Sequence, residues 1–224
     1  MESRDEKELV ERVETVIDRD RVLNFSDAIF AFAATLLILK IDLPNIPPEL
    51  IETRLGPEIL NLWPSYFANL ISFLVIGYYW LTHHAIFNMI RRFNQTLFWL
   101  NVTFLIFISF LPFPVDLFGD FGNSRSVVVF YSAALALAGY LLTILWLYVS
   151  HDNKLIDKSV SKRRIQFYTL KHMVAPIVFT LSIPVAFIDL TLAKLSWLFV
   201  FLGIVLIHRV YHYRQLDDLE KTAL

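Results

Sequence analysis

The sequence has 224 residues, of which 56% are hydrophobic and only 18% are charged, and its formal net charge is −1. Soluble domains are about 45–50% apolar and about 25% charged. Together with a mean hydropathy of +0.55, this composition excludes an ordinary soluble domain and indicates a polytopic membrane protein. The chain contains no cysteine, which excludes disulfides, thiol nucleophiles and thiolate metal sites.

Residues 1–20 are highly charged and contain no apolar core of a signal peptide, so we expect a short polar helix there. Six apolar stretches follow that are long enough to cross about 30 Å of hydrocarbon at about 1.5 Å per residue. They cover roughly residues 22–43, 63–87, 95–118, 126–149, 169–190 and 194–212. The fold predicted from this pattern is an all-α integral membrane protein with six transmembrane helices.

Proline residues predict where several of these helices end or bend. The proline-rich, acidic segment between the first two stretches is predicted to be a loop. In the motif FLPFP, Pro112 and Pro114 are expected to break the third helix. Pro176 and Pro184 predict kinks in the fifth helix.

The distribution of basic residues predicts the orientation. Of the 20 lysines and arginines, only Lys40, Arg54, Arg125 and Lys194 lie in segments on one side of the predicted helices. By the positive-inside rule, the other side is cytoplasmic and holds both termini. We therefore divide the chain into a cytoplasmic segment 1–20, a six-helix transmembrane domain 21–213 and a cytoplasmic tail 214–224.

The first span, RVLNFSDAIFAFAATLLILKIDL, carries Arg21, Ser26 and Asp27 near its start. A charge in the middle of a span costs about 2.5–3.5 kcal/mol on insertion scales, so it usually has a buried partner. One interpretation makes Ser26 or Asp27 an N-cap at the membrane surface. A second is a buried ion-pair and hydrogen-bond cluster, because the second span returns to the same depth with three polar aromatic residues: Trp80, His83 and His84. A third is a proton relay through the same groups.

Motifs for metals, nucleotides and hydrolysis are missing from the sequence. His83 and His84 would point about 100° apart on a helix. His208 and His212 are spaced for a metal but lack a third ligand nearby in sequence, so interfacial histidines are favoured over a metal site. The chain has no Gly-rich phosphate loop, HExxH or GxSxG, and no TVGYG run for a carbonyl-lined potassium filter. We expect neither an enzyme nor a cofactor.

The first span also carries an apolar stripe at helical spacing, formed by Phe25, Phe32, Leu36, Leu39 and Leu43. Thr35 lies beside the stripe, and a neighbouring face is small: Ala28, Ala31 and Ala34. Such a face lets helices approach closely. The stripe fits lipid contact or core packing, or alternatively a pore lined by apolar rings that gate by dewetting.

The pattern R-x-x-x-F-S-D-x-x-F-A-x-A-x-T-L-L over residues 21–37 resembles the signature of the transmembrane protein 175 family of potassium channels, and more specifically its prokaryotic members. YYWLTHHAIF in the second span is similar to the family's tryptophan–histidine segment, and LNVTFLIFISFLPFP to its third helix. The resemblance covers essentially the whole chain. It implies a homotetramer in which four copies of the first helix line a central pore.

The resemblance also assigns roles to residues. It implies constriction rings at Phe32, Leu36 and Leu39, and an ion-coordinating hydroxyl at Thr35. It implies a structural network of Arg21, Phe25, Ser26, Asp27 and Trp80 with His83 or His84, of which His84 is favoured. Phe32 departs from the family pattern, because isoleucine or leucine is usual at this position. The departure concerns the conductance and the selectivity of the pore.

The leading hypothesis is a channel that conducts K⁺ in preference to Na⁺ in a prokaryotic cell membrane. Its partners would be further copies of the same chain, membrane lipid and the permeant K⁺, with no nucleic acid. The alternative is a proton-coupled transporter or proton-permeable pathway using Asp27 and the two histidines. A third reading is a non-conducting scaffold whose basic loop binds anionic lipid.

Overall fold

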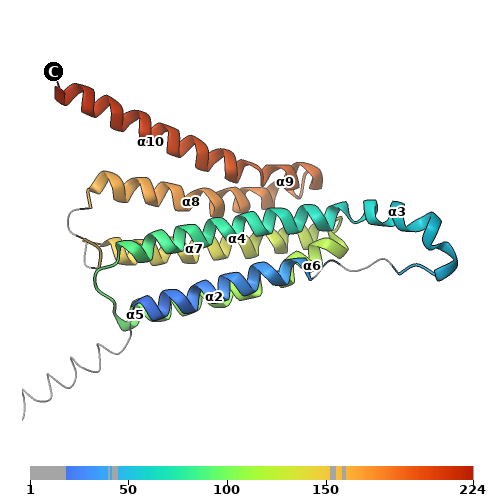
Figure 1. Cartoon of the computed structure of the whole chain (residues 1–224). Helices are drawn as coiled ribbons and strands as arrows, with labels where there is room; N and C mark the ends of the chain where they lie inside the picture. Colours follow the sequence, from blue (N-terminus) through green and yellow to red (C-terminus); the bar gives the residue numbers. More distant parts are fainter. Residues whose placement is uncertain (1–18, 40, 42–44, 152–154, 158–159, 224) are drawn as a thin grey trace, which may run out of the picture.

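The computed structural model describes residues 19–39, 41, 45–151, 155–157 and 160–223. Within these ranges the regular structure is helical apart from one isolated β-bridge, and the long helices run side by side (Figure 1). Six segments are long and apolar enough to cross a membrane: Arg19–Ile38, Ser65–Met89, Gln95–Phe121, Arg125–Ser150, Lys162–Val185 and Leu190–Tyr211. Each coincides with one predicted stretch, so the prediction of an all-α protein with six membrane-capable helices is confirmed. Most of segment 1–20, together with Lys40 and Leu43, lies outside the described residues.

The segment between the first two spans is a helix, where a loop was predicted. Helix α2 (Arg19–Ile38) is followed by the 3₁₀ turn η1 (Pro48–Leu50), by α3 (Ile51–Asn61) and by α4 (Trp63–Met89). The prediction was wrong because the apolar residues of α3 recur every four positions, as in Ile51, Leu55 and Ile59, and this spacing is typical of an amphipathic helix. Pro48 is the first residue of η1, where its missing N–H costs nothing, whereas Pro57 lies inside α3.

The third span also continues through its prolines. Helix α5 (Gln95–Phe110) and helix α6 (Pro112–Phe121) are separated by a turn at Leu111 alone. Pro112 is the first residue of α6 and Pro114 the third. The backbone N–H groups of a first helical turn have no intrahelical acceptor, so a proline in that turn does not end the helix. The predicted break is thus a one-residue interruption.

The second half of the chain contains α7 (Arg125–Ser150), α8 (Lys162–Val185), α9 (Leu190–Ser196) and α10 (Phe199–Ala223). Helix α8 begins seven residues earlier than predicted, because Ser161 caps it by accepting a hydrogen bond from the Arg164 amide at 3.3 Å. Pro176 and Pro184 both lie inside α8. The backbone of α10 stays helical across the predicted boundary between residues 213 and 214.

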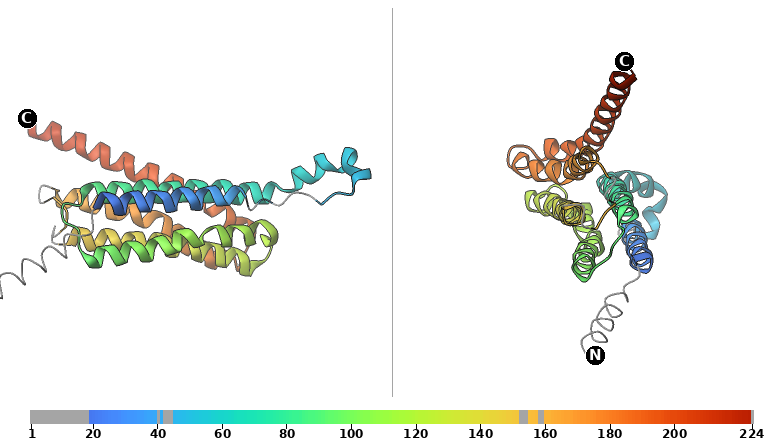
Figure 2. Two further views of the ribbon diagram at one scale, coloured as in Figure 1. Left: turned by 60° about the horizontal axis from the view of Figure 1, so that its bottom comes forward. Right: turned by 90° about the vertical axis from the view of Figure 1, so that its left-hand side faces the viewer.

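Helix α7 is the centre of the packing. It contacts α8 most extensively and also α5 and α6. At Gly139 an added Cβ would lie 2.7 Å from the Tyr79 hydroxyl and 2.9 Å from Cδ of Pro176, so only glycine allows this approach of α7 to α4 and α8. Helix α10 packs mainly on α8 and leans away from the bundle toward its C-terminus (Figure 2).

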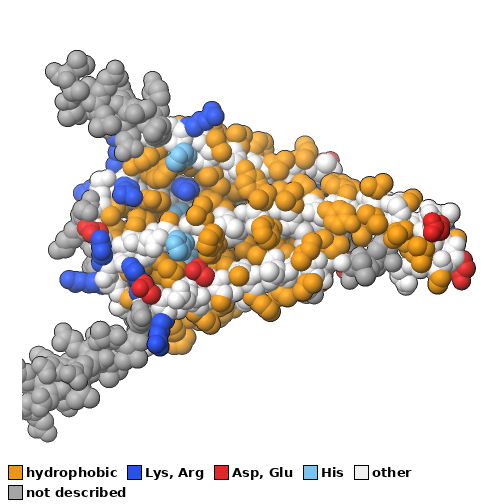
Figure 3. All heavy atoms as spheres, in the orientation of Figure 1, with side chains coloured by type: hydrophobic (Ala, Val, Ile, Leu, Met, Phe, Trp, Pro, Cys, Tyr) orange, Lys and Arg blue, Asp and Glu red, His pale blue; other side chains and the backbone are white. Residues whose placement is uncertain are grey.

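The ends of the bundle differ in charge. The start of α2, the α4–α5 turn, the α7–α8 connection and the C-terminal part of α10 lie at one end, and α3 and α9 at the other (Figure 1). Lysine and arginine side chains gather at the first end (Figure 3). The α4–α5 turn and the α7–α8 connection are joined at this end. Ile90 and Ile156 form the β-bridge, and the Arg91 amide donates to the Leu155 carbonyl at 2.8 Å. Segments predicted to share one side of the membrane are therefore neighbours in space.

Candidate pore helix and its polar contacts

Helix α2 buries one narrow face against α4, α5 and α6. Its buried residues recur every three or four positions: Val22, Ser26, Phe30, Ala33 and Leu37. This spacing places them on one side of an α-helix. Because α2 begins at Arg19, Ser26 and Asp27 lie in its second and third turns, and the interpretation of either residue as an N-cap is wrong.

A second face of α2 carries the predicted pore stripe. In the single chain Phe25 is 57%, Phe32 63% and Leu39 74% exposed, while Leu36 is half-buried. Ala28 and Ala31 are also exposed. The described part of the chain therefore leaves an apolar stripe flanked by small residues uncovered along its first helix.

Thr35 is exposed on the far side of α2 from the buried face. Its hydroxyl donates to the Phe32 carbonyl at 2.9 Å. A hydroxyl has one proton and two acceptor lone pairs, so this bond uses the proton and leaves the lone pairs of Oγ1 directed away from the backbone. Such an oxygen can accept a hydrogen bond or bind a cation.

Ser26 belongs to a buried chain of side chains that joins three helices. Asn101 of α5 donates from Nδ2 to the Ser26 hydroxyl at 3.0 Å, and its Oδ1 lies 2.7 Å from Nε2 of His83 on α4. All three residues are completely buried. The His83 ring stacks on Phe87, with centroids 4.3 Å apart. The network thus connects α2 to α4 and α5 through hydrogen bonds in an apolar interior.

The proton positions in this chain follow from the bonds themselves. The Ser26 hydroxyl donates its one proton to the Val22 carbonyl at 2.8 Å, so toward Asn101 it can only accept. Asn101 must then present its NH₂ to Ser26 and its oxygen to His83. Nε2 of His83 is consequently the donor. Sequence reasoning missed this bridge. The signal was Asn101, an asparagine within a predicted span, where its amide requires a partner.

Asp27 contacts α4 by a different route. The indole Nε1 of Trp80 donates to Oδ1 of Asp27 at 2.8 Å, as the predicted network requires. Among the described residues, however, no hydrogen bond or ion pair joins Asp27 to Arg21, which is exposed. The two side chains are six residues apart and point about 120° apart around the helix at about 100° per residue. Of the predicted cluster, the described residues thus show the hydrogen bond between Asp27 and Trp80 but no ion pair between Asp27 and Arg21.

The two histidines have separate environments. The favoured partner of the motif was His84, but His83 is the histidine that reaches Ser26 through Asn101. His84 lies beside Trp80, with ring centroids 5.9 Å apart. Adjacent residues on a helix point in directions about 100° apart and so meet different neighbours. For the same reason Phe25 points to the outside, Ser26 to the core and Asp27 to α4.

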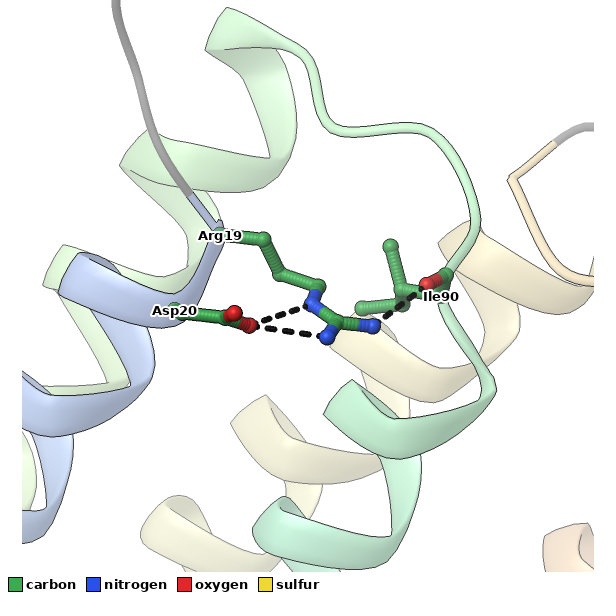
Figure 4. A network of polar contacts seen from close by, with 3 residues as sticks. All are labelled: Arg19, Asp20 and Ile90. Atoms are coloured by element: carbon green, nitrogen blue, oxygen red, sulfur yellow. Dashed lines mark hydrogen bonds and ion pairs between the residues drawn. The ribbon is translucent and has the colours of Figure 1, made fainter.

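Arg19, which sequence reasoning did not single out, connects the start of α2 to the α4–α5 turn. Arg19 donates from Nη1 to the Ile90 carbonyl in the α4–α5 turn at 3.1 Å and from Nε and Nη2 to Oδ1 of Asp20 (Figure 4). The Ile90 carbonyl follows the last turn of α4, where carbonyls lack intrahelical donors. Because Ile90 also pairs with Ile156, this contact connects the first helix to the α7–α8 connection.

The described residues contain no group of three or more histidine or acidic side chains that could hold a metal ion. His208 lies on α10 near the Phe167 ring, while the side chain of His212 is outside the described set. Several polar groups within the spans are hydrogen-bonded between helices, as Asn101 is to Ser26 and His83, which is an arrangement expected of a membrane-embedded helical bundle.

Comparisons with known proteins bear on the same helices. The family described as endosomal/lysosomal potassium channel TMEM175 matches residues 21–112. A potassium channel of Streptomyces collinus is 30% identical over 190 residues, which cover 82% of this chain and 90% of that protein. The crystal structure of a potassium-selective TMEM175 homologue from Chamaesiphon minutus aligns with a TM-score of 0.69 and 27% identity over 88% of this chain and 97% of that one. The endosomal/lysosomal proton channel TMEM175 of Gallus gallus is 33% identical over 132 residues, 54% of this chain and 26% of that protein.

The six apolar helices and their buried polar contacts define a multi-pass α-helical membrane protein. The similarity to the Streptomyces protein extends over most of both chains. The chain therefore belongs to the TMEM175 family, a family of ion channels and not of enzymes.

Proposed function

We propose that the chain forms a homotetrameric channel that conducts K⁺ in preference to Na⁺, with α2 of each copy lining a central pore. The observation that carries the proposal is the uncovered apolar stripe of α2, with Phe32 and Leu39 more than half exposed. An integral membrane protein has no general reason to place small residues beside such a stripe, but a helix that packs against copies of itself does.

A second exposed region of α2 supports assembly through the same helix. A groove of about 600 Å³ runs between α2 and α4 and is lined by residues including Asp27, Ala31, Ala34, Phe73 and Trp80. Apolar side chains of an adjacent copy would fill this space, with the small alanines allowing close approach. In such an assembly the Asp27–Trp80 hydrogen bond would lie at a subunit boundary.

Selectivity would arise from the rings and the hydroxyl together. The sequence has no TVGYG segment, so backbone carbonyls of that kind are not the filter. Rings at Phe32, Leu36 and Leu39 would make a dry constriction that a fully hydrated ion passes with difficulty. The lone pairs of Thr35 would coordinate a partly dehydrated K⁺, and no cofactor beyond this permeant ion is required.

The basic end of the bundle would face the cytoplasm of a prokaryotic cell, which places both termini inside. Figure 3 supports this orientation because lysines and arginines gather at the end that holds the α4–α5 turn and the α7–α8 connection. The acidic helix α3 would then lie on the outer side. The remaining partners would be membrane lipid and K⁺, with no nucleic acid.

Proton permeation is the alternative, favoured by the description of the Gallus gallus relative as a proton channel. Asp27 borders the α2–α4 groove and could exchange protons there. His83 is less suited to a relay, because its Nε2 donates to Asn101 and its buried Nδ1 has no partner among the described residues. A proton pathway predicts flux that depends steeply on pH and persists without K⁺.

The test is ion flux into proteoliposomes, with K⁺ and Na⁺ gradients measured separately. We expect the wild type to pass K⁺ faster than Na⁺. Leu36→Ala should raise Na⁺ flux about fivefold or more, equivalent to lowering the barrier by about 1 kcal/mol, because the dry ring widens. Phe32→Ala is compared with it, and the larger effect identifies the narrower ring.

The matched control is Leu137→Ala, which makes the same truncation at a position of α7 that is 42% exposed and outside the proposed pore. Unchanged selectivity in Leu36→Ala and Phe32→Ala would remove both residues from the pore. Flux of protons alone, with no K⁺ movement in protein that is tetrameric, would contradict potassium conduction and favour the alternative.

A further inference from the structure

A groove of about 240 Å³ lies between α8 and α10, where the two helices diverge. Its walls are mainly apolar, with Phe167 and Leu170 from α8 and Leu206 and Val210 from α10. Leu170 is 61% and Leu206 51% exposed, so neither helix covers the other's side chains there. In a membrane, apolar walls left open in this way must be filled by another apolar group, because an empty gap loses dispersion contacts on every side.

One end of the groove is polar and basic. Arg163 and Gln166 line it there. The two helices also carry, outside the lining of the groove, Lys162, Arg164, Lys171, His208 and Arg209. Neither α8 nor residues 199–211 contains an aspartate or glutamate. This end belongs to the basic end of the molecule (Figure 3), so its potential favours an anion.

Two stacked aromatic side chains lie between the basic end and the apolar walls of the groove. The rings of Phe167 and Tyr211 stack with centroids 4.0 Å apart. The guanidinium of Arg163 lies 6.0 Å from the centre of the Tyr211 ring, at the outer limit of cation–π contact. Tyr211 also lies close to the end of the predicted span 194–212, and tyrosine at a span end marks the membrane–water boundary. Arg163 is therefore at the depth of lipid phosphates.

We propose that the α8–α10 groove binds an anionic phospholipid, with its phosphate at Arg163 and one acyl chain against Leu170 and Leu206. The order along the groove, from basic to aromatic to apolar, follows the order of groups in a phospholipid. Basic pockets between transmembrane helices are known recognition sites for anionic headgroups, and the arginine fork fits phosphate in a bidentate manner. The proposal does not depend on the pore, because α8 and α10 lie outside it.

The experiment is native mass spectrometry of the full-length protein, released from detergent containing equal amounts of phosphatidylglycerol and phosphatidylcholine. We expect the wild type to retain phosphatidylglycerol preferentially. Arg163→Gln should lower that preference about fivefold, the effect of one basic residue near a charged membrane surface. Leu206→Trp, which fills the apolar part, should lower retention of both lipids.

Two control variants make the same changes elsewhere. Arg54→Gln removes a charge on α3 at the opposite end, and Leu202→Trp enlarges an exposed residue of α10 that does not line the groove. Both should retain lipid as the wild type does. Thermal melting of every variant establishes folding, so if Leu206→Trp does not fold, Arg163→Gln alone decides.

The proposal is overturned if Arg163→Gln and Arg54→Gln retain phosphatidylglycerol equally. It is also overturned if the wild type retains the two lipids equally, since the groove would then not recognise charge. A groove variant that lowers the mass of the oligomer without releasing lipid would instead assign the surface to a second copy of the chain, which also contradicts lipid binding. Because no flux is measured, these outcomes are independent of channel activity.

Discussion

The buried chain from Ser26 through Asn101 to His83 allows a quantitative test of what holds the first helix in place. Asn101→Leu preserves the size of the side chain but removes both of its hydrogen bonds. Nε2–H of His83 then has no acceptor in a completely buried site. An unsatisfied buried donor costs about 1–3 kcal/mol, and the lost bond to Ser26 adds about 0.6 kcal/mol, the average for hydrogen bonds between membrane helices.

Asn101→Leu should therefore destabilise the protein by about 2–4 kcal/mol, which lowers the melting temperature of a chain of this size by roughly 5–15 °C. The assay is thermal unfolding in detergent, followed by tryptophan fluorescence. Asn88→Leu is the matched control, since Asn88 is exposed on α4 and should shift the melting temperature little.

The reasoning makes a second, opposite prediction. Replacing every member of a buried polar network by apolar groups of similar shape can be nearly neutral, whereas removing one member is not. The triple variant Ser26→Ala, His83→Phe, Asn101→Leu should thus be more stable than Asn101→Leu alone. The hydrogen-bond assignment is refuted if Asn101→Leu melts within about 2 °C of Asn88→Leu, or if the triple variant is the less stable of the two network variants.

Two further predictions concern the fold. Arg19→Ala removes the donor to the Ile90 carbonyl. Amide exchange in the α4–α5 turn should therefore accelerate about 2- to 10-fold, corresponding to one hydrogen bond of about 0.5–1.5 kcal/mol. Among the described residues Arg21 has no hydrogen bond to that turn, so equal acceleration in Arg21→Ala would contradict this role of Arg19. Gly139→Ala should destabilise by about 1–3 kcal/mol through overpacking, because the new methyl group meets a tyrosine hydroxyl at 2.7 Å. In thermal melts Gly56→Ala, where nothing lies within 4 Å, should be at least as stable as the wild type, and a harmless Gly139→Ala would show that α7 and α8 can move apart.

Much of this protein was determined by the sequence itself. The six spans are local properties, because in a bilayer each backbone segment must satisfy its own hydrogen bonds and therefore forms a helix wherever hydrophobicity is sustained. The motif of the first span was sufficient to indicate the family, which the comparisons confirmed. The local reasoning failed where it took proline as the end of a helix or as part of a loop. Pro112 begins α6, Pro48 begins η1, and Pro57 lies inside α3.

The partners of individual side chains were decided only by the tertiary structure. Whether His83 or His84 reaches the motif depends on the rotation of α4 about its axis, and Asn101 enters because α5 passes the same depth on the other side. Arg21 and Arg19 differ by two residues, or about 200° around the helix, and only Arg19 meets the α4–α5 turn. Periodicity states which residues share a face, but which helix covers that face is set by the packing of the whole bundle, where side-chain volumes and hydrogen bonds must be satisfied together.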